Sequence, residues 1–471
     1  MRLYNTRTRQ VEEFVPLRDG EVGIYVCGMT PSAQAHLGHA RSFLFFDVLR
    51  RYLTHKGYTV RYVQNVTDID DRSIREGQAT GQDYHAVIDR YYGEFKASMR
   101  KLGVLEYDDE PYATRYIEPI QTMIRELIDR GHAYATGDGI YYRVSTFPRY
   151  GKLANRNIDE LEAGARIEVD EQKEDPLDFA LWKFAKPGEP KWPFPPFGEG
   201  RPGWHIECSA MSRGLLDPQG VGFDIHGGGA DLIFPHHENE IAQSEPLMDR
   251  PPMANVWVHG GLLLFENRKM SKSLGNFEPL SQLLERHDPQ AIRLLFLQTG
   301  YRKVMNFTEG SIAAAAVTLR QLKRKYRALT AGERAGVADA ALLAKIEAAL
   351  DDDMNTAVAL AELLGDKTAS LETFTRAIAL LGLEPNPSWL EEPKAELPAD
   401  FVERVSAAVA DVSFNGATPQ EALDRVIELR TQARARKEWA ESDRLRDALL
   451  ACGVELKDSK EGTAWTVAGL P

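Results

Sequence analysis

The chain has 471 residues, of which 43% are hydrophobic and 27% are charged, and its formal net charge is −13. This length predicts roughly two to four domains, and the composition is that of a globular protein. No stretch approaches the ~20 apolar residues of a membrane span, and no apolar signal region opens the chain, so we expect a cytoplasmic protein without a membrane segment. The acidic balance says little about nucleic acid, because phosphate contacts depend on local basic patches.

The three cysteines are Cys27, Cys208 and Cys452. They are too few and too scattered for a disulfide framework, and no CxxC pair is present. Composition alone favours three reduced thiols.

The N-terminal region is predicted to be α/β. A short apolar run at 22–26 is typical of a strand, helical spacing covers 42–56, and 58–63 is again rich in strand-forming residues. Strand, helix and strand within about 40 residues form a βαβ unit, which predicts a parallel sheet. Ligands of such sheets bind at the carboxyl ends of the strands, and the segment 27–39 is expected there.

The middle of the chain alternates between predicted elements and loops. We expect a helix at 117–130, a strand at 140–144, an irregular proline-rich loop at 187–202, and strand ends at 224–229 and 256–260.

Beyond about residue 305 the pattern becomes helical. Alanine and leucine recur at helical spacing, and a linker with proline and glutamate follows near 385–398. The last small unit is predicted to contain one basic helix at 422–450 and short strands at 454–456 and 463–467.

The first motif, His36-Leu37-Gly38-His39, falls where the first predicted strand gives way to the first predicted helix. A helix N-terminus offers unpaired N–H groups and a positive dipole end, which suit phosphate. Gly38 lets a planar group approach the backbone, and two imidazoles can donate to the charge of a transferring phosphoryl group. Four letters alone also fit two structural histidines.

The second motif is Lys269-Met270-Ser271-Lys272-Ser273. Two lysines flanking small hydroxyl residues in a flexible loop make a mobile cationic clamp for phosphates. The alternative is a solvated basic loop.

Four residues have side chains that can ligate a metal. His236 and Glu240 are four positions apart, so on a helix they face the same way. Thiolates of Cys27 and Cys208 would complete a tetrahedral zinc site of the Cys₂HisGlu kind. The pattern is not HExxH, which disfavours a zinc protease. Spacing alone leaves the zinc hypothesis open.

The two motifs together resemble the HIGH and KMSKS signatures of class I aminoacyl-tRNA synthetases, with HLGH a mild change from HIGH. The resemblance implies that an amino acid is joined to the α-phosphate of ATP and transferred to tRNA. The segment 227–231 resembles the family's third nucleotide-binding segment, in which Asp231 would meet the ribose; a solvated aspartate is the alternative. The residues implied in catalysis are His36, His39, Lys269 and Lys272, and those implied in ATP binding are His36, Gly38, His39, Asp231 and Lys272.

Longer strings resemble the cysteinyl-tRNA synthetase family over nearly the whole chain. They are VCGMT, HLGHARS, YVQNVTDIDD, GWHIECSAMS, FDIHGGGADLIFPHHENEIAQSE, HGGLLLFENRKMSKSLGN and KEWAESDRLRDALL. The resemblance implies an α/β fold with a Rossmann-like catalytic domain, an insertion, an α-helical bundle and a small mixed anticodon-binding domain. The corresponding ranges are 1–115 with 200–305 for the catalytic domain, 116–199 for the insertion, 306–384 for the bundle, 385–414 for a linker and 415–471 for the C-terminal domain.

The same resemblance implies a reaction and its cofactors. L-Cysteine would be activated by ATP, with Mg²⁺, to cysteinyl-adenylate and transferred to tRNA(Cys). One Zn²⁺ would select the substrate thiol, since soft zinc prefers thiolate to hydroxyl while apolar pockets separate near-isosteres poorly. The implied zinc ligands are Cys27, Cys208, His236 and Glu240, and the implied cysteine-pocket residues are Thr30, Trp204 and His226.

One segment departs from the family pattern. Residues 31–35 read PSAQA, where the family usually has a segment of the Val-Tyr-Asp type. Contacts to cysteine or adenylate are the properties that this departure puts in question.

The tRNA side rests on local basic patches and one tryptophan. The run at 321–327, QLKRKYR, and the C-terminal residues Arg434 and Arg436 fit a phosphate surface or a solvated helix face. Trp465 matches a tryptophan that stacks on an anticodon base in the family, with a core tryptophan as the alternative. We expect a monomer.

Two other functions are compatible with parts of the sequence. A cysteine ligase that passes the adenylate to an amino-sugar, as in mycothiol synthesis, resembles the catalytic half, and Thr30-Pro31 is somewhat like it. A catalytically inactive tRNA-binding paralogue with structural zinc is the second alternative. The long basic C-terminus argues against the first and the intact motifs against the second.

Overall fold

The computed structural model describes residues 1–156, 172–269, 278–332, 340–391, 397, 400–414, 416–459 and 462–467. The chain forms two compact units, Met1–Leu390 and Glu391–Pro471.

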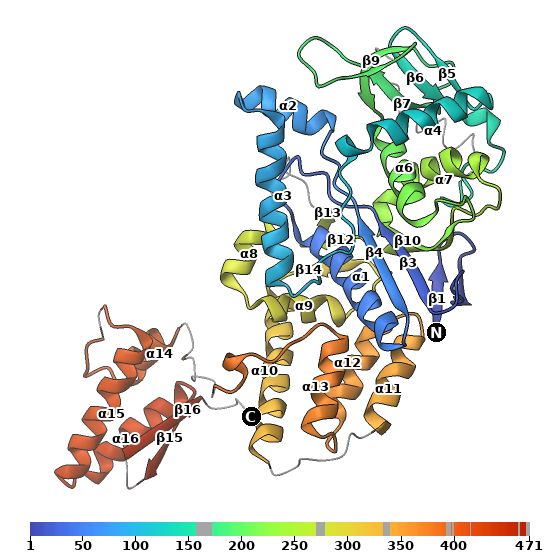
Figure 1. Ribbon diagram of the computed structural model, residues 1–471. Coiled ribbons are helices and arrows are strands. Elements are labelled where there is room, and N and C mark those ends of the chain that lie inside the picture. The colour runs from blue at the N-terminus through green and yellow to red at the C-terminus, as the bar shows by residue number, and fades with distance from the viewer. Residues whose placement is uncertain are drawn as a thin grey trace. The chain divides into compact units, whose positions relative to one another are not determined.

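The first unit is built on a four-stranded parallel sheet (Figure 1). Its strand order is β11-β10-β3-β4, formed by Ala254–Gly260, Phe223–Gly229, Glu21–Val26 and Thr59–Gln64. All three pairings are parallel, as the βαβ pattern predicted. The crossover from β3 to β4 is α1, Leu37–His55, which starts five residues earlier than its apolar spacing indicated because His36 caps it.

The order of these strands creates a switch point. From β3 the chain passes through α1 to β4 on one side, whereas β10 pairs with β3 on the other side. Ligands of open α/β sheets bind at such a point, beyond the carboxyl ends of the strands. Cys27 follows β3 there, and its N–H donates to the carbonyl of Gly227 at 3.1 Å.

The insertion is a mixed α/β layer around a second core. Helix α4, Ile117–Asp129, packs with an antiparallel sheet in the order β5-β6-β7-β9-β8. Its strands are Ala133–Ala135, Gly139–Tyr142, Phe179–Phe184, Gly198–Pro202 and Trp192–Phe194.

The loop expected at 187–202 was therefore partly wrong, since it contains β8 and β9. Pro193 is tolerated because β8 is the edge strand. Gly200 is required because a Cβ there would lie 2.3 Å from the carbonyl oxygen of Lys183 on the neighbouring strand. The sequence pattern suggested a loop because the residues that permit this close pairing are also turn formers.

Helices that flank the sheet carry the site. They are α6 at Trp204–Leu216, η4 at Ile233–His237 and α7 at Glu238–Ser244. Helices α2 at Asp71–Thr80 and α3 at Tyr84–Lys101 follow β4.

A small sheet and a helical bundle complete the first unit. The sheet order is β13-β12-β14, formed by Arg268–Lys269, Leu263–Phe265 and Met305–Phe307, and the hairpin β1–β2 covers Arg2–Asn5 and Gln10–Glu13. The helices are α8 at Leu280–Arg286, α9 at Pro289–Leu297, α10 at Glu309–Ala331, α11 at Ala340–Asp351, α12 at Thr356–Gly365 and α13 at Leu371–Leu380.

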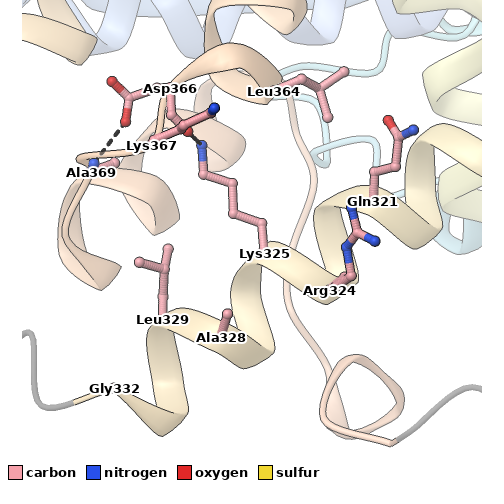
Figure 2. A pocket seen from close by; sticks show the side chains of 10 residues that line it. All are labelled: Gln321, Arg324, Lys325, Ala328, Leu329, Gly332, Leu364, Asp366, Lys367 and Ala369. Carbon is pink, nitrogen blue, oxygen red and sulfur yellow. Dashed lines mark hydrogen bonds between the residues drawn. The ribbon is translucent and has the colours of Figure 1, made fainter. Parts of the chain in front are cut away.

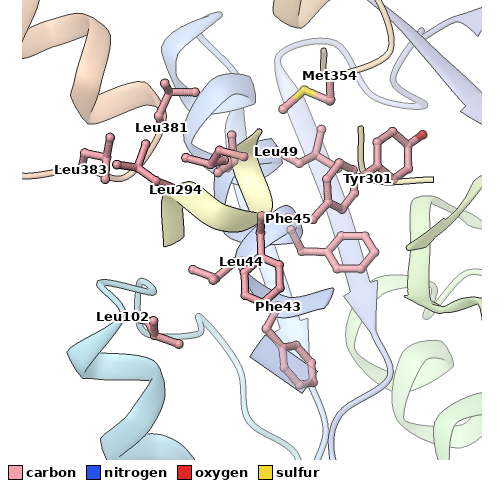
Figure 3. Packing of buried hydrophobic residues seen from close by; sticks show 14 of the residues in the cluster. Phe43, Leu44, Phe45, Leu49, Leu102, Leu294, Tyr301, Met354, Leu381 and Leu383 are labelled. Atoms are coloured by element: carbon pink, nitrogen blue, oxygen red, sulfur yellow. The ribbon is translucent and has the colours of Figure 1, made fainter. Parts of the chain in front are cut away.

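One hydrophobic core joins α1 to the bundle. Phe45 and Leu49 of α1 lie among Leu294, Met354 and Leu381 from the later helices (Figure 3).

A buried ion pair crosses this core. Arg293 of α9, which is 0% exposed, donates to the carboxylate of Asp47 on α1 and to the carbonyl oxygens of Leu381 and Leu102 at 2.7 and 3.1 Å. Burial alone would raise the pKa of Asp47, but Arg293 and Arg51 outweigh it and hold the pKa below its ordinary value.

In its described residues, the second unit has its own core of eleven buried side chains, which come from three helices, the loops that follow two of them and a β-hairpin. The elements are α14 at Phe401–Ala408, α15 at Pro419–Ala435, α16 at Trp439–Ala451, β15 at Val454–Ser459 and β16 at Gly462–Val467. The single helix expected at 422–450 was wrong: Lys437 has a φ of 62°, a left-handed conformation that ends α15 before α16 begins. The domain boundaries proposed from the sequence stay predictions.

Candidate active site

The first signature is organised by its own histidines. His36 caps α1, because its Nδ1 accepts from the N–H of Gly38 at 3.0 Å, and Nδ1 of His39 accepts from the N–H of His36 at 3.2 Å. The two rings stack with centroids 4.0 Å apart. Since each Nδ1 accepts a hydrogen bond, the neutral tautomer of each ring carries its proton on Nε2.

Burial keeps these imidazoles neutral. It lowers the pKa of His39 to about 3, with help from the neighbouring His36. It also lowers the pKa of His36, although the carboxylate of Asp231 acts in the opposite direction. The rings are therefore hydrogen-bond donors at neutral pH and not cations.

The glycine-rich end of β10 lies against the signature helix. A Cβ on Gly227 would come within 2.2 Å of the ring of Phe46 on α1, so only glycine allows α1 to lie this close to the strand. Asp231 follows in η3, Ala230–Leu232, and is exposed. Its negative charge acts to raise the pKa of His36, and its expected contact with the ribose of ATP stays a prediction.

The second signature is described only at its start. β13 ends at Lys269, whose backbone pairs with Leu264. Lys272, together with the rest of 270–277, lies outside the described residues. The roles expected for Lys269 and Lys272 stay predictions.

The four candidate metal ligands converge from separate segments. Cys27 follows β3, Cys208 lies in α6, His236 lies in η4 and Glu240 lies in α7. Their ligand atoms all lie within 4.8 Å of one another, and no member is more than 5% exposed. Sγ of Cys27 is 3.6 Å from Sγ of Cys208 and 3.4 Å from Oε1 of Glu240, which is 3.1 Å from Nε2 of His236.

This donor set fits zinc. Two sulfurs, one imidazole nitrogen and one carboxylate oxygen are ligands that tetrahedral Zn²⁺ takes. Burial raises the pKa of both Cys27 and Cys208, because a thiolate is poorly solvated there. A cation at the centre would favour the thiolates that burial alone opposes.

A second set of four donors overlaps the first. Cys27, His226, His237 and Glu240 also place their ligand atoms within 4.8 Å of one another. Nε2 of His226 lies 2.9 Å from Oε2 of Glu240, and Nε2 of His237 lies 3.3 Å from Sγ of Cys27. These histidines can orient the thiol and the carboxylate through hydrogen bonds.

Sequence reasoning missed three histidines of this network. Nδ1 of His205 lies 2.9 Å from Nδ1 of His236, and Nδ1 of His237 lies 2.7 Å from Nε2 of His259. The available signals were the doublet at 236–237, the position of His205 three residues before Cys208, and the strand-end position of His259.

The other predicted pocket residues differ in their contacts. The ring of Trp204 lies over His236 with centroids 4.3 Å apart, and Trp204 is still 37% exposed. His226 is fully buried, whereas Thr30 is half-buried and its carbonyl accepts from the N–H of Ser32 at 2.8 Å. The unusual segment 31–35 is anchored to α8, because the carbonyl of Ala35 accepts from the N–H of Leu280 at 2.8 Å.

The basic run at 321–327 borders a cavity of about 620 Å³ in the bundle (Figure 2). Nζ of Lys325 points to the loop after α12 and donates to the carbonyl oxygens of Leu363, at 2.7 Å, and Asp366. The cavity lining is Gln321, Arg324, Lys325, Ala328, Leu329, Gly332, Leu364, Asp366, Lys367 and Ala369. It includes none of the site residues above.

The C-terminal basic residues are partly engaged in ion pairs. Nη1 of Arg434 lies 2.7 Å from Oδ2 of Asp458, and Nε of Arg436 lies 3.1 Å from Oε2 of Glu438. Trp465 of β16 is half-buried. Trp439, which sequence reasoning passed over, is 59% exposed at the start of α16.

Among the described residues, no helix has both the length and the apolar character needed to cross a membrane.

Comparison with known proteins identifies the class first. Residues 13–317 match the family described as the tRNA synthetases class I (C) catalytic domain. Solved structures share the fold at low identity. A Mycobacterium tuberculosis methionyl-tRNA synthetase with methionyl-adenylate has 16% identity and a TM-score of 0.54, over 77% of this chain and 89% of its own. The Agrobacterium radiobacter K84 agnB2 LeuRS in a ternary complex with tRNA has 12% identity and a TM-score of 0.56, over 78% and 84%. The fold is that of a class I aminoacyl-tRNA synthetase.

Full-length relatives then identify the family. A cysteine–tRNA ligase of Stutzerimonas stutzeri (strain A1501) is 44% identical over 478 residues, covering 99% of both chains. That of Ectopseudomonas mendocina (strain ymp) is 45% identical over 476 residues, also covering 99% of both. The chain belongs to the cysteine–tRNA ligase family.

Proposed function

We propose that this chain activates L-cysteine with ATP, forming cysteinyl-adenylate and pyrophosphate, and then transfers the cysteinyl group to the 3′ end of tRNA(Cys). The observation that carries the proposal is the buried cluster of Cys27, Cys208, His236 and Glu240 at the switch point of the sheet. It supplies a reason for cysteine specificity beside a signature helix suited to ATP.

The four donors of the cluster would hold one Zn²⁺. When bound, it would supply a soft Lewis acid that takes the substrate sulfur as a ligand and prefers it to the oxygen of serine. The protein's own contribution is the rigid, buried placement of the donors. Trp204, over His236, would restrict the space beside that ligand, and His205, whose Nδ1 lies 2.9 Å from Nδ1 of His236, would fix the orientation of the His236 ring.

The phosphate side would be served by α1 and the lysines of the second signature. His36 and His39 would donate from Nε2 to phosphate oxygens, and Gly38 would allow the nucleotide to approach the backbone. Asp231 would contact the ribose. Lys269 and Lys272 would neutralise the pyrophosphate as it leaves, with ATP entering as its Mg²⁺ complex.

Thr30 and His226 would line the cysteine pocket. Trp465, Arg434 and Arg436 would contact tRNA, with the exposed Trp439 as a further stacking surface. We also propose a cytoplasmic monomer. The alternatives are not favoured, because cysteine–tRNA ligases align with 99% of this chain, including its C-terminal unit.

The decisive experiment combines two assays of the purified chain. Cysteine-dependent ATP–pyrophosphate exchange tests activation, and charging of tRNA(Cys) against glucosaminyl-inositol tests the acceptor. Exchange without tRNA charging would favour the amino-sugar ligase, and no exchange would favour the inactive paralogue. Zinc-depleted enzyme should lose its preference for cysteine over serine; an unchanged preference would rule out metal-based selection.

A further inference from the structure

Arg41 is a buried cation that joins the signature helix α1 to two other segments of the chain, 261–262 and 301–303, which we call the two crossings. It is 5% exposed. Its Nη1 donates to the carbonyl oxygens of Gly261 at 3.0 Å and Leu262 at 2.8 Å. Its Nη2 donates to those of Tyr301, at 3.3 Å, and Lys303. The planar guanidinium presents its donors in a fixed fork, so one side chain can hold both crossings at a set distance.

This arrangement is costly for stability alone. Burial lowers the pKa of Arg41 to about 10, and no carboxylate in the described part of the chain compensates for it. A charge balanced only by carbonyl dipoles keeps much of its desolvation penalty, and an apolar side chain would fill such a position with less. The role of the guanidinium is therefore to fix the relative positions of the carbonyl groups to which it donates.

The two crossings held by Arg41 lead directly into strands of the small sheet. Gly261 and Leu262 lead into β12 and, through a two-residue turn, into β13 and Lys269. The crossing at 301–303 leads into β14, which pairs with β12. The N–H of Gly261 also donates to the carbonyl of Tyr301 at 2.7 Å, so the two crossings are hydrogen-bonded to each other as well as to Arg41.

A second contact lies one turn further along α1. The ring of Phe45 stacks on the ring of Tyr301 with centroids 4.0 Å apart and planes 15° from parallel (Figure 3). Two contacts on successive turns fix both the distance and the rotation of α1 relative to the small sheet.

We infer that Arg41 is a positioning residue for adenylate formation: it sets the spacing between the histidines at the start of α1 and the strand that delivers Lys269. The inference rests on the proposed function, because it assigns phosphate contacts to both ends of this span. Arg41 acts through these groups. Adenylyl transfer, like phosphoryl transfer, depends on the placement of the reacting groups, and an error of about 1 Å can cost on the order of 10²-fold in rate.

The test compares Arg41→Lys with Arg293→Lys as a matched control. Both arginines are buried in the first unit and both contact backbone carbonyls, but Arg293 holds Asp47 and not the small sheet. We expect both variants to lower the unfolding temperature. Only Arg41→Lys should lower kcat/KM for ATP in pyrophosphate exchange, by about 10²-fold, because one ammonium cannot hold both crossings.

Three readouts separate positioning from a general loss of structure. In Arg41→Lys, the KM for cysteine and the transfer of cysteine from preformed adenylate to tRNA should stay within about twofold, since neither needs the pyrophosphate contacts. Backbone amides of 263–269 should exchange hydrogen faster than in Arg293→Lys. Equal ATP kinetics in the two variants, corrected for folded protein, would overturn the inference, and so would unchanged amide exchange.

If Arg41→Lys does not fold, Phe45→Leu replaces it. This change removes the ring stack and keeps an apolar side chain, and about a tenfold loss in the same ATP step is expected. A loss below twofold would overturn the inference. Wild-type protein without pyrophosphate exchange would refute the proposed function, while the amide-exchange comparison would still decide whether Arg41 fastens the sheet.

Discussion

The two sides of the proposed site, one for the substrate thiol and one for the phosphates of ATP, are built differently. On the thiol side, the donors of Cys27, Cys208, His236 and Glu240 are at most 5% exposed and already lie within 4.8 Å of one another. On the phosphate side, the rings of the first signature are half-buried and Asp231 is exposed.

The difference follows from what each side must distinguish. Cysteine and serine differ by a single atom, sulfur for oxygen, so their separation needs a fixed set of donors shielded from water. ATP is large and charged, and its pyrophosphate must leave, so its contacts can be fewer and more open. Under the proposed function, selection of the substrate thiol would therefore lie in the core and release of pyrophosphate nearer the surface.

The largest effect is expected from breaking the thiol side. Cys208→Ser removes a soft ligand, so bound zinc should fall from about one per chain to near zero, and cysteine-dependent pyrophosphate exchange should fall by about 10³-fold. Metal analysis and the exchange assay measure both. Cys452→Ser is the matched control, since Cys452 is buried in the second unit, and equal zinc loss in both variants would contradict the assignment.

A substitution outside the thiol side and the phosphate side tests the stability of the fold separately from the activity of the site. Asp47→Asn leaves Arg293 buried without its carboxylate, and should lower the free energy of unfolding by about 3 kcal/mol, measured by urea denaturation at pH 7.

The same pair predicts a pH dependence. Because the pKa of Asp47 is lowered in the folded state, its contribution is complete above the unfolded pKa of about 4 and is lost as the pH falls below it. The difference between wild type and Asp47→Asn should therefore shrink in acid. A constant difference from pH 7 to pH 3 would contradict the pairing.

Breaking the phosphate side should cost less. His39→Ala should lower kcat for pyrophosphate exchange by about 10²-fold and leave zinc content unchanged. Since burial lowers the pKa of His39 to about 3, its titration should give no inflection in the wild-type rate between pH 5 and 8. An inflection near the ordinary histidine pKa of about 6.5 that disappears in His39→Ala would refute the neutral assignment.

The smallest effect is expected from the second unit. Trp465→Ala should reduce tRNA charging by about tenfold, the value of one base–aromatic stack, with pyrophosphate exchange unchanged. Trp465→Phe keeps an aromatic face and should recover most of the loss. Equal charging by Trp465→Ala and wild type would assign Trp465 to the core.

Much of this comparison could be predicted from the sequence. The strand before Cys27 and the helix after the first signature place that cysteine at a sheet edge, and the i, i+4 spacing of His236 and Glu240 places both on one face. The helix that holds Cys208 is preceded by residues that were expected to form a loop and that pair as strands.

The remainder depends on contacts between distant segments. The histidine chain through His237 and His259 joins residues 22 positions apart, and nothing in local spacing indicates it. Arg41 resembles any arginine on a helix until its carbonyl partners, some 220 to 262 positions away, are known. The sequence pattern did not predict the break at Lys437, because helical spacing resumes after the turn.

The core shared by α1 and the bundle has a consequence for modularity. Tyr52 of α1 is fully buried and its hydroxyl donates to Asp351 at 2.7 Å, so a fragment ending before α10 would expose the inner face of the signature helix to water. The bundle therefore cannot be removed without exposing this core, and a minimal activating fragment has to extend through Trp389, the last of the described residues in that core. The second unit has an interior of its own, so under the proposed function its truncation or fusion should change acceptor recognition and leave cysteine activation in place.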